Sequence, residues 1–198
     1  MMWNERYAGQ DYLFGTEPAA FLKREAGRLA PQSRVLSVAD GEGRNSVHLA
    51  GLGHQLHAMD GAANAVEKAR KLAADRGVSA SFEVADISTW EWAPDSYDAV
   101  VAIFIQFVGP EARRQIFDGI TRTLKSGGVL LLHGYTPKQL EYGTGGPKVL
   151  ENLYTPEQLR AELPGLTIER LEAYEADVDE GKGHSGRSAL IDFIGRKP

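Results

Sequence analysis

The sequence predicts an α/β fold in which a doubly wound, seven-stranded sheet carries helices on both faces. Two observations support this prediction. Over the first two thirds of the 198 residues, short apolar runs alternate with longer segments of helical periodicity, which is typical of βαβ units. The run 99–104 is apolar at every position and therefore indicates a central strand buried on both faces of a parallel sheet.

The individual elements follow from hydrophobic period and from turn residues. Strands are expected at 34–39, 55–59, 80–85, 97–104, 129–133, 166–176 and 188–196. Helices are expected from Thr16-Glu17-Pro18 to about Ala30, around 47–52, and at 62–76, 110–125 and 156–163. The stretches 87–96 and 137–151 are expected to be irregular, and a polar loop at 177–186 joins the last two strands.

Composition limits the class of protein. Hydrophobic residues at 42% and charged residues at 25% are typical of a globular chain, and the length suits one domain spanning 1–198. The absence of cysteine excludes disulfides and thiolate metal sites. No apolar run is long enough to cross a bilayer, and the first residues lack a signal-peptide core, so we expect a cytoplasmic protein without membrane association. The net charge of −5 and scattered basic residues disfavour nucleic acid as the main partner.

A glycine-rich turn follows the first expected strand. It reads Ala39-Asp40-Gly41-Glu42-Gly43-Arg44-Asn45 and leads into the next helix. Gly41 and Gly43 lack side chains, so a ligand can approach the backbone, and the helix start offers free N–H groups. Ligands of open α/β sheets bind at the carboxyl ends of strands, which makes this turn a candidate nucleotide site. Taken alone, the turn is equally compatible with an ordinary connection.

Acidic residues end the next two strands. Asp60 follows the second strand, where a carboxylate can accept hydrogen bonds from both hydroxyls of a ribose. Asp86 and Ile87 follow the third strand, and a carboxylate beside an apolar side chain suits the amino group and ring face of adenine. Two solvated loop acids would be the alternative, but that interpretation would not account for both standing at strand ends.

With these residues identified, segment 35–45 resembles the first motif of class I S-adenosylmethionine-dependent methyltransferases. It is most similar to the branch that contains tellurite-resistance and thiopurine-methyltransferase-like proteins. Further segments similar to that branch are 3–7, 12–18, 97–106, 135–137, 145–147 and 180–186. The resemblance covers nearly the whole chain and implies a Rossmann-like sheet that is mostly parallel with an antiparallel last strand.

The resemblance implies S-adenosylmethionine as the cofactor. Asp60 would bind its ribose, and Asp86 and Ile87 would border its adenine. The other cofactor-binding residues that the resemblance implies are Trp3, Tyr7, Ala39, Asp40, Gly41, Gly43, Asn45, Gly61, Ile103 and Phe104. In this arrangement the glycine turn lies along the methionine portion, and the start of the chain folds over the cofactor.

The sequence departs from the family pattern at two positions. Ser37 stands where the family usually carries an acid, and Ala39 replaces the more common glycine. These departures imply that the cofactor is bound in a modified way. They leave open the alternative that the protein is a non-catalytic, cofactor-binding regulatory module. A nicotinamide-dependent oxidoreductase is a third alternative, which fits less well because the chain lacks a clean Gly-x-Gly-x-x-Gly and ends in a strand pair.

The methyl acceptor is expected to be a small molecule, and the family name suggests a thiol or chalcogen compound. Methyl transfer requires the acceptor and the methyl group in line, and a general base only where the acceptor must lose a proton. Candidates around the acceptor are His184, His133 and Tyr135 as catalytic residues, with Gln106 and Tyr142 nearby. His133 is equally interpretable as a buried polar residue, and His184 as a solvated loop residue.

No metal site is expected. His54 and His57 lie three positions apart on a strand and should point to opposite faces. The oligomeric state is left open by the sequence.

Overall fold

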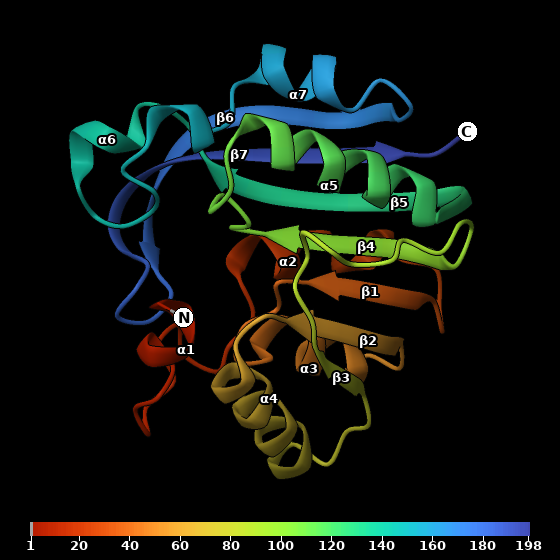
Figure 1. The fold of residues 1–198 in the computed structure, drawn as a ribbon, viewed down its shortest axis with the longest axis vertical. Helices are drawn as coiled ribbons and strands as arrows, with labels where there is room; N and C mark the ends of the chain where they lie inside the picture. Colours follow the sequence, from red (N-terminus) through yellow and green to blue (C-terminus); the bar gives the residue numbers. More distant parts are fainter. Residues whose placement is uncertain (1) are drawn as a thin grey trace.

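The computed structural model describes residues 2–198 and contains one seven-stranded sheet (Figure 1). The strands are β1 Arg34–Val38, β2 Gln55–Asp60, β3 Ser81–Val84, β4 Tyr97–Ile103, β5 Leu124–Tyr135, β6 Thr167–Asp179 and β7 Ser185–Arg196. The helices are α1 Met2–Arg6, α2 Ala20–Glu25, α3 Arg44–Gly51, α4 Ala63–Asp75, α5 Pro110–Thr123, α6 Gln139–Tyr142 and α7 Pro156–Glu162. Short 3₁₀ turns are η1 Ala26–Arg28 and η2 Leu150–Asn152.

The sheet has the strand order β3-β2-β1-β4-β5-β7-β6. β1 pairs in parallel with β2 and β4, β2 with β3, and β4 with β5. β7 lies antiparallel between β5 and β6. The predicted fold class is therefore confirmed, including the antiparallel last strand. The order reverses at β1 and β4, and such a switch point is where open α/β sheets bind ligands.

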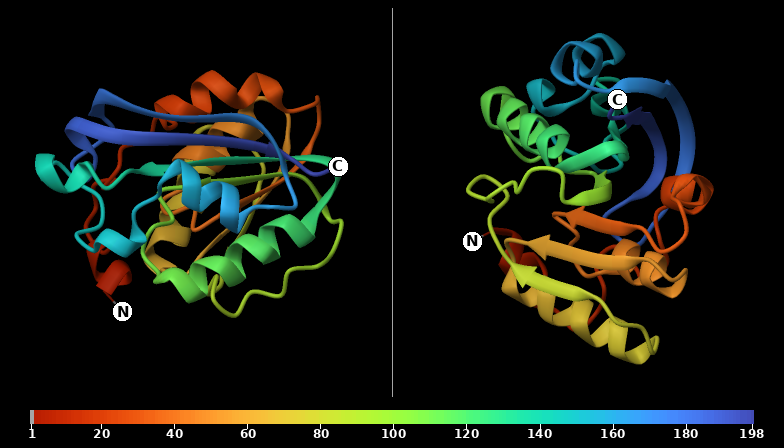
Figure 2. Two further views of the ribbon diagram at one scale, coloured as in Figure 1. Left: turned by 90° about the horizontal axis from the view of Figure 1, so that it is seen from above. Right: turned by 90° about the vertical axis from the view of Figure 1, so that its right-hand side faces the viewer.

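Alternating side chains of the central strands build two apolar cores. Leu36 and Val38 face the core that contains α5 and α7, whereas Val35 faces the core that contains α2 and α3. Figure 2 shows α5 and α2 on opposite sides of the sheet. The period of two that separates these contacts explains why a strand apolar at every position occupies the centre.

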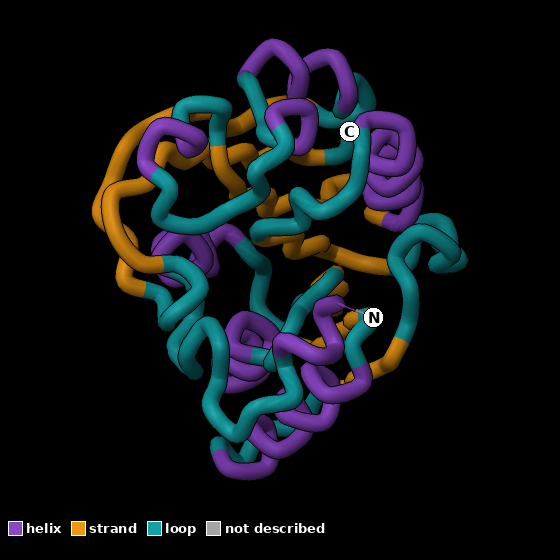
Figure 3. Tube along the Cα trace, turned by 60° about the vertical axis from the view of Figure 1, so that its left-hand side comes forward, coloured by secondary structure: helices purple, strands orange, loops and turns teal. Residues whose placement is uncertain are grey.

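The carboxyl ends of the parallel strands lie at one edge, where the start of the chain also lies. In Figure 1 the arrowheads of β1 and β4 point toward α1. Figure 3 shows the first helix and several loops gathered at this end of the molecule. The tip of the β6–β7 hairpin also reaches this edge, because the backbone N–H of Gly183 donates to the Leu13 carbonyl (3.3 Å). The edge is thus covered from two sides.

Several boundaries differ from the sequence prediction; β5, for example, begins at Leu124 and not at 129. The helix expected from Thr16 begins instead at Ala20, because the Asn45 Oδ1 and Glu180 Oε1 atoms accept from the N–H groups of Ala19 and Ala20. These long-range contacts fix the helix start after the proline. The loop expected at 177–186 is much shorter, since the antiparallel pairing of β6 and β7 continues from Asp179 to Ser185.

Within residues 2–198, no helix combines the length and the apolar character needed to span a membrane.

Gly119 of α5 gives a direct test of packing. A Cβ at this position would lie 2.5 Å from ring atoms of Trp92, whereas a Cβ at Gly51 of α3 would meet its nearest atom at 3.9 Å. We expect Gly119→Ala to lower the free energy of unfolding by about 1 kcal/mol or more, because the clash outweighs the gain of about 1 kcal/mol in helix propensity. Gly51→Ala is the matched control and should be neutral or stabilising. Urea denaturation measures both, and equal effects would contradict this packing.

Candidate active site

A cavity of about 770 Å³ opens at the carboxyl edge of the sheet. It is lined by most of the residues predicted from the sequence: Trp3, Tyr7, Ala39, Asp40, Gly41, Asn45, Asp60, Gly61, Asp86, Ile87, Ile103 and Phe104, with Tyr135 and His184. These residues come from the tips of the five strands β1 to β5, the chain start and the β6–β7 hairpin. The structure therefore brings residues that are far apart in the sequence into one cavity.

Asp60 joins the tips of three strands. Its Oδ2 accepts from the N–H of Gly41 and its Oδ1 from the N–H of Ala62, both at 2.8 Å. Its backbone carbonyl accepts from the N–H of Ala85, which follows β3. Desolvation raises the pKa of the Asp60 carboxyl, although both backbone hydrogen bonds favour the ionised form. The carboxylate is therefore fixed in place at the floor of the cavity.

Asp40 is engaged by two serine hydroxyls. Ser37 donates to one carboxylate oxygen (2.6 Å) and Ser46 to the other (2.5 Å). Desolvation raises the pKa of Asp40 to about 6, against the effect of the two hydroxyl donors. A second carboxylate at position 37 would face Asp40 with like charge, so the serine at this position suits its neighbour. The Asp40 carboxylate therefore links Ser37 of β1 to Ser46 of α3 and stabilises the glycine turn between them.

The backbone adopts left-handed conformations at two non-glycine residues of the cavity wall. Ala39 has φ +47° and Phe104 has φ +57°, and these residues directly follow β1 and β4. Such conformations cost roughly 1–3 kcal/mol each, and they cluster at functional sites. Glycine has no Cβ and would adopt the positive φ at position 39 at a lower conformational energy than alanine does.

Two predicted cofactor residues have other roles. Gly43 does not line the cavity: a Cβ there would lie 2.7 Å from the Ala69 Cβ, so glycine allows α3 and α4 to pack closely. Its φ of +88° also favours glycine. Asn45 does line the cavity, but its Oδ1 accepts from the N–H of Ala19 (2.9 Å) and orders the start of α2.

The chain start folds over the cavity. Asn64 donates two hydrogen bonds to Asn4, from its backbone N–H to Oδ1 (2.9 Å) and from its side-chain amide to the backbone carbonyl (2.8 Å), and they attach α4 to α1. Trp3 stacks on Tyr7 at a ring separation of 5.9 Å, and Tyr7 is 6% exposed. The structure thus places both predicted aromatic residues in the wall of the cavity.

Glu42 attaches the segment that follows. Its buried carboxylate accepts from the N–H of Leu13 (2.7 Å) and from the Lys68 ammonium (2.8 Å). The middle residue of the glycine turn therefore does not face a ligand; it connects the chain start to the turn and to α4.

His184 and Tyr135 form a buried pair. The Tyr135 hydroxyl lies 2.6 Å from His184 Nδ1, and the imidazole stacks between Phe14 and Phe104 at 4.4 and 4.2 Å. Desolvation, aided by the positive charge of Arg44, lowers the pKa of His184 to about 3. Desolvation also raises the pKa of Tyr135, so its hydroxyl keeps the proton and can donate it to Nδ1. The imidazole is neutral near pH 7, and in the tautomer in which Nδ1 accepts from Tyr135 its proton is on Nε2.

His133 lies away from the cavity, contrary to the expectation that it faces the cleft. Its ring stacks on Phe21 of α2 at 4.8 Å, and its Nδ1 lies 2.7 Å from an oxygen of the fully buried Asp192. His133 and Tyr135 share a face of β5, but Tyr135 is the last residue of the strand and lines the cavity, whereas His133 lies further from the strand end, against α2. The interpretation as a buried polar residue applies.

Several cavity residues were not predicted. They include Asn4, Arg6, Phe14, Arg44, Phe107 and the segment 145–149. Glycines at 181 and 183 allow the hairpin tip to touch Phe14, since a Cβ at Gly183 would lie 2.1 Å from its ring. Gln106, a candidate for acceptor contact, instead uses its amide to bind the backbone of Tyr135 in both directions (2.7 and 2.8 Å).

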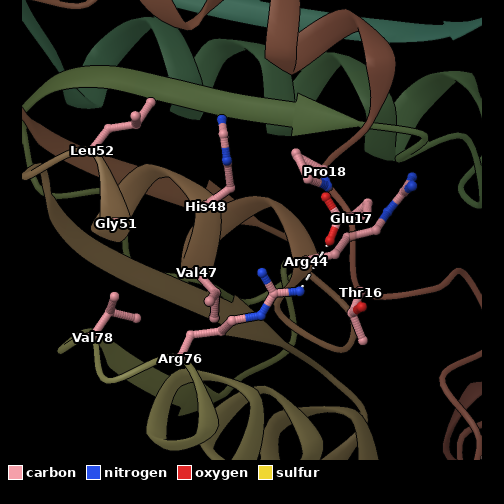
Figure 4. A pocket seen from close by; sticks show the side chains of 10 residues that line it. All are labelled: Thr16, Glu17, Pro18, Arg44, Val47, His48, Gly51, Leu52, Arg76 and Val78. Carbon is pink, nitrogen blue, oxygen red and sulfur yellow. Dashed lines mark hydrogen bonds and ion pairs between the residues drawn. The ribbon is translucent and has the colours of Figure 1, made fainter.

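A smaller cavity of about 310 Å³ lies on the other side of α3 (Figure 4). It is bordered by Thr16, Pro18 and the first turns of α3, and the Arg76–Glu17 ion pair (3.0 Å) crosses it. Residues 2–198 contain no cluster of three or more histidine or acidic side chains arranged to bind a metal ion.

Part of the chain that carries these features is similar to a known domain. Residues 35–128 match the family model of a methyltransferase domain. The matched segment runs from β1 into β5 and supplies the floor of the cavity, whereas the chain start and the β6–β7 hairpin lie outside it. A search of curated protein sequences found no match.

Solved structures share the fold over most of the chain. One, from work on the conversion of a disulfide bond into a thioacetal group during echinomycin biosynthesis, has a TM-score of 0.78 at 21% identity, covering 99% of this chain and 90% of that chain. A SAM-dependent methyltransferase from Methanosarcina mazei has a TM-score of 0.73 at 19% identity, covering 87% and 96%. TehB from Haemophilus influenzae has a TM-score of 0.71 at 17% identity, covering 89% and 61%.

The buried imidazole predicts acid sensitivity. An unfolded chain binds a proton at His184 near pH 6.5, whereas the folded protein does so only near pH 3, so stability falls as the pH drops through this window. At about pH 4.5 the loss from this group is roughly 2–3 kcal/mol. We expect His184→Gln to lose less stability than the wild type between pH 7.5 and 4.5 in urea denaturation. The opposite contribution of Asp40 is present in both proteins and cancels; equal losses would refute this assignment.

Proposed function

We propose that the protein binds S-adenosylmethionine in the strand-end cavity and transfers its methyl group to a small-molecule acceptor. The observation that carries the proposal is the convergence of the glycine turn, Asp60 and the Asp86–Ile87 tip on one cavity. The methyltransferase-domain match over 35–128 supports it independently. The volume of about 770 Å³ is also in the range of roughly 300–1,000 Å³ that is usual for small-molecule sites.

The residues present fit the cofactor. Asp60 offers a fixed carboxylate for the ribose hydroxyls, and the exposed Asp86 stands beside the buried Ile87 for adenine. A Cβ at Gly41 would project to within 3.2 Å of the Tyr7 hydroxyl and would fill the cavity at this point, so glycine keeps the space open. The two carboxylates, the apolar side chain and the open space at Gly41 therefore suit a nucleoside.

The chain's own contribution to the reaction is orientation and exclusion of water. When bound, S-adenosylmethionine supplies a methyl group on a positively charged sulfur. The N-terminal segment and the hairpin tip close over the cavity, and the buried aromatic rings around His184 hold an acceptor in an apolar setting. Proximity and alignment of this kind are worth several kcal/mol of the barrier.

His184 and Tyr135 are proposed to position the acceptor. The imidazole stays neutral near pH 7 and its Nδ1 already accepts the Tyr135 proton, so neither group serves as an efficient proton acceptor. The geometry therefore suits an acceptor that arrives in its nucleophilic form, and a thiol or chalcogen compound is one such class.

The test is a binding and turnover experiment. Isothermal titration with S-adenosylmethionine and with NAD separates a methyltransferase from an oxidoreductase, and we expect heat with the first only. Incubation with a panel of thiols, followed by mass spectrometry, should show S-adenosylhomocysteine and a methylated product. Binding without any turnover across the panel would favour the non-catalytic module.

Asp60→Ala should weaken S-adenosylmethionine binding by roughly 1–3 kcal/mol, because charged hydrogen bonds to the ribose are lost. Asp118→Ala is the matched control, since Asp118 is exposed on α5 and does not line the cavity. Titration calorimetry measures both, and circular dichroism checks that the variants fold. A dissociation constant for Asp60→Ala equal to that of the wild type would remove Asp60 from the ribose site.

A further inference from the structure

Arg44 is a buried cation in the wall of the cavity, and only one of its two terminal nitrogens has a hydrogen-bond partner. It is the first residue of α3, lines the cavity and is 6% exposed. Its Nη2 donates to Glu180 Oε2 at 2.8 Å. Its Nη1 is buried and has no hydrogen-bond partner among residues 2–198. A buried N–H without an acceptor costs about 1–3 kcal/mol, and such groups are rare in native proteins.

Arg44 borders both cavities. In Figure 4 its guanidinium lies apart from the Arg76–Glu17 ion pair of the smaller pocket. The hairpin tip connects Arg44 to His184, because Glu180 pairs with Arg44 and donates its backbone N–H to the carbonyl of His184 (2.8 Å). His184 lines the larger cavity; its Nδ1 is engaged by Tyr135, and its Nε2 forms no hydrogen bond within residues 2–198.

Glu180 does not bind the second nitrogen. Its Oε2 accepts from Arg44 Nη2, and its Oε1 accepts from the N–H of Ala20 at 2.9 Å. Both carboxylate oxygens are therefore engaged. The remaining donor of the guanidinium and the imidazole N–H are left to a group that enters the cavity.

We infer that Arg44 Nη1 and His184 Nε2–H together bind a carboxylate of the ligand in this cavity. The inference rests on the proposed function and adds a residue pair to it. A carboxylate matches the planar guanidinium and forms charge-assisted hydrogen bonds, which are about twice as strong as neutral ones. It has two sources: the methionine portion of the cofactor, or an anionic acceptor.

Access requires a small movement of the hairpin tip. Nη1 is shielded from water, and the tip is attached to the chain start by the 3.3 Å hydrogen bond from Gly183 to Leu13 and by the exposed Lys182–Asp11 ion pair. Exposed ion pairs contribute about 0–1 kcal/mol, so the Lys182–Asp11 pair opposes this movement little, whereas the Arg44–Glu180 pair and the His184–Tyr135 hydrogen bond hold the base of the tip in place. Ligand entry and the pairing of Nη1 are thus coupled.

The first arm of the experiment compares two ligands by titration calorimetry. S-adenosylhomocysteine carries the carboxylate, whereas 5′-deoxy-5′-methylthioadenosine has the same nucleoside and sulfur without the amino acid. If the cofactor supplies the carboxylate, Arg44→Gln should weaken S-adenosylhomocysteine binding by roughly 10- to 100-fold and leave methylthioadenosine binding within about twofold. Glu180→Gln, which loses the ion pair but keeps Nη1, should not separate the two ligands.

The second arm tests an anionic acceptor. Benzoate and the uncharged benzamide are titrated into the protein saturated with S-adenosylhomocysteine. If the acceptor supplies the carboxylate, the wild type binds benzoate in preference to benzamide, and Arg44→Gln abolishes that preference while cofactor binding is unchanged. Arg44→Lys, which keeps a cation for Glu180, replaces Arg44→Gln should the latter not fold, with an intermediate loss expected.

The outcomes are distinct. Equal weakening of S-adenosylhomocysteine and methylthioadenosine by Arg44→Gln would show a structural role and overturn the inference, as would no change in either arm. Failure of the wild type to bind either nucleoside would instead overturn the proposed function, and the inference with it.

Discussion

The hydrogen bonds around Asp60 are the constraint on which the site depends. One residue joins three strand tips, through its carboxylate to Gly41 and through its carbonyl to Ala85. A parallel sheet brings these tips to one edge, but it does not fix their loops relative to one another. The carboxylate does so by satisfying backbone N–H groups that the strands leave unpaired. The same group is then in position to meet a ribose, so structure and binding use the same atoms.

The rest of the site is attached around this centre by buried polar contacts from distant segments. Glu42 ties the chain start to the glycine turn, and the Arg44–Glu180 pair ties the hairpin tip to α3. Glu42 and Arg44 both lie within three residues of Gly41, so one short turn organises both covers of the cavity. Buried ion pairs of this kind contribute more to a specific arrangement than to net stability. The closed cavity consequently depends on few residues.

The sequence predicted the sheet and the floor of the site because both follow from local patterns. Apolar runs of period two located the strands, and the acids at their ends located the cavity. It did not predict the boundary at Ala20, because this depends on contacts to Asn45 and Glu180, which are far away in the sequence. It did not predict the length of the hairpin, because the added pairs, such as Asp177 with Arg187, are polar and carry no apolar pattern. Gly43 was assigned to the ligand because the sequence around a glycine does not show which contact requires it. Here the contact is the close approach of Ala69. His133 and Tyr135 share a face of β5, and only Tyr135, at the end of the strand, reaches the cavity; the sequence does not show how far along the strand the cavity extends.

The most direct test is a crystal structure with S-adenosylhomocysteine bound. The account predicts the ribose against the Asp60 carboxylate, the adenine between Asp86–Ile87 and the β4 tip, and the sulfur facing His184 and Tyr135. A nucleoside bound elsewhere, such as in the smaller pocket beside α3, or an Asp60 carboxylate that keeps its distance from the ribose, would contradict it.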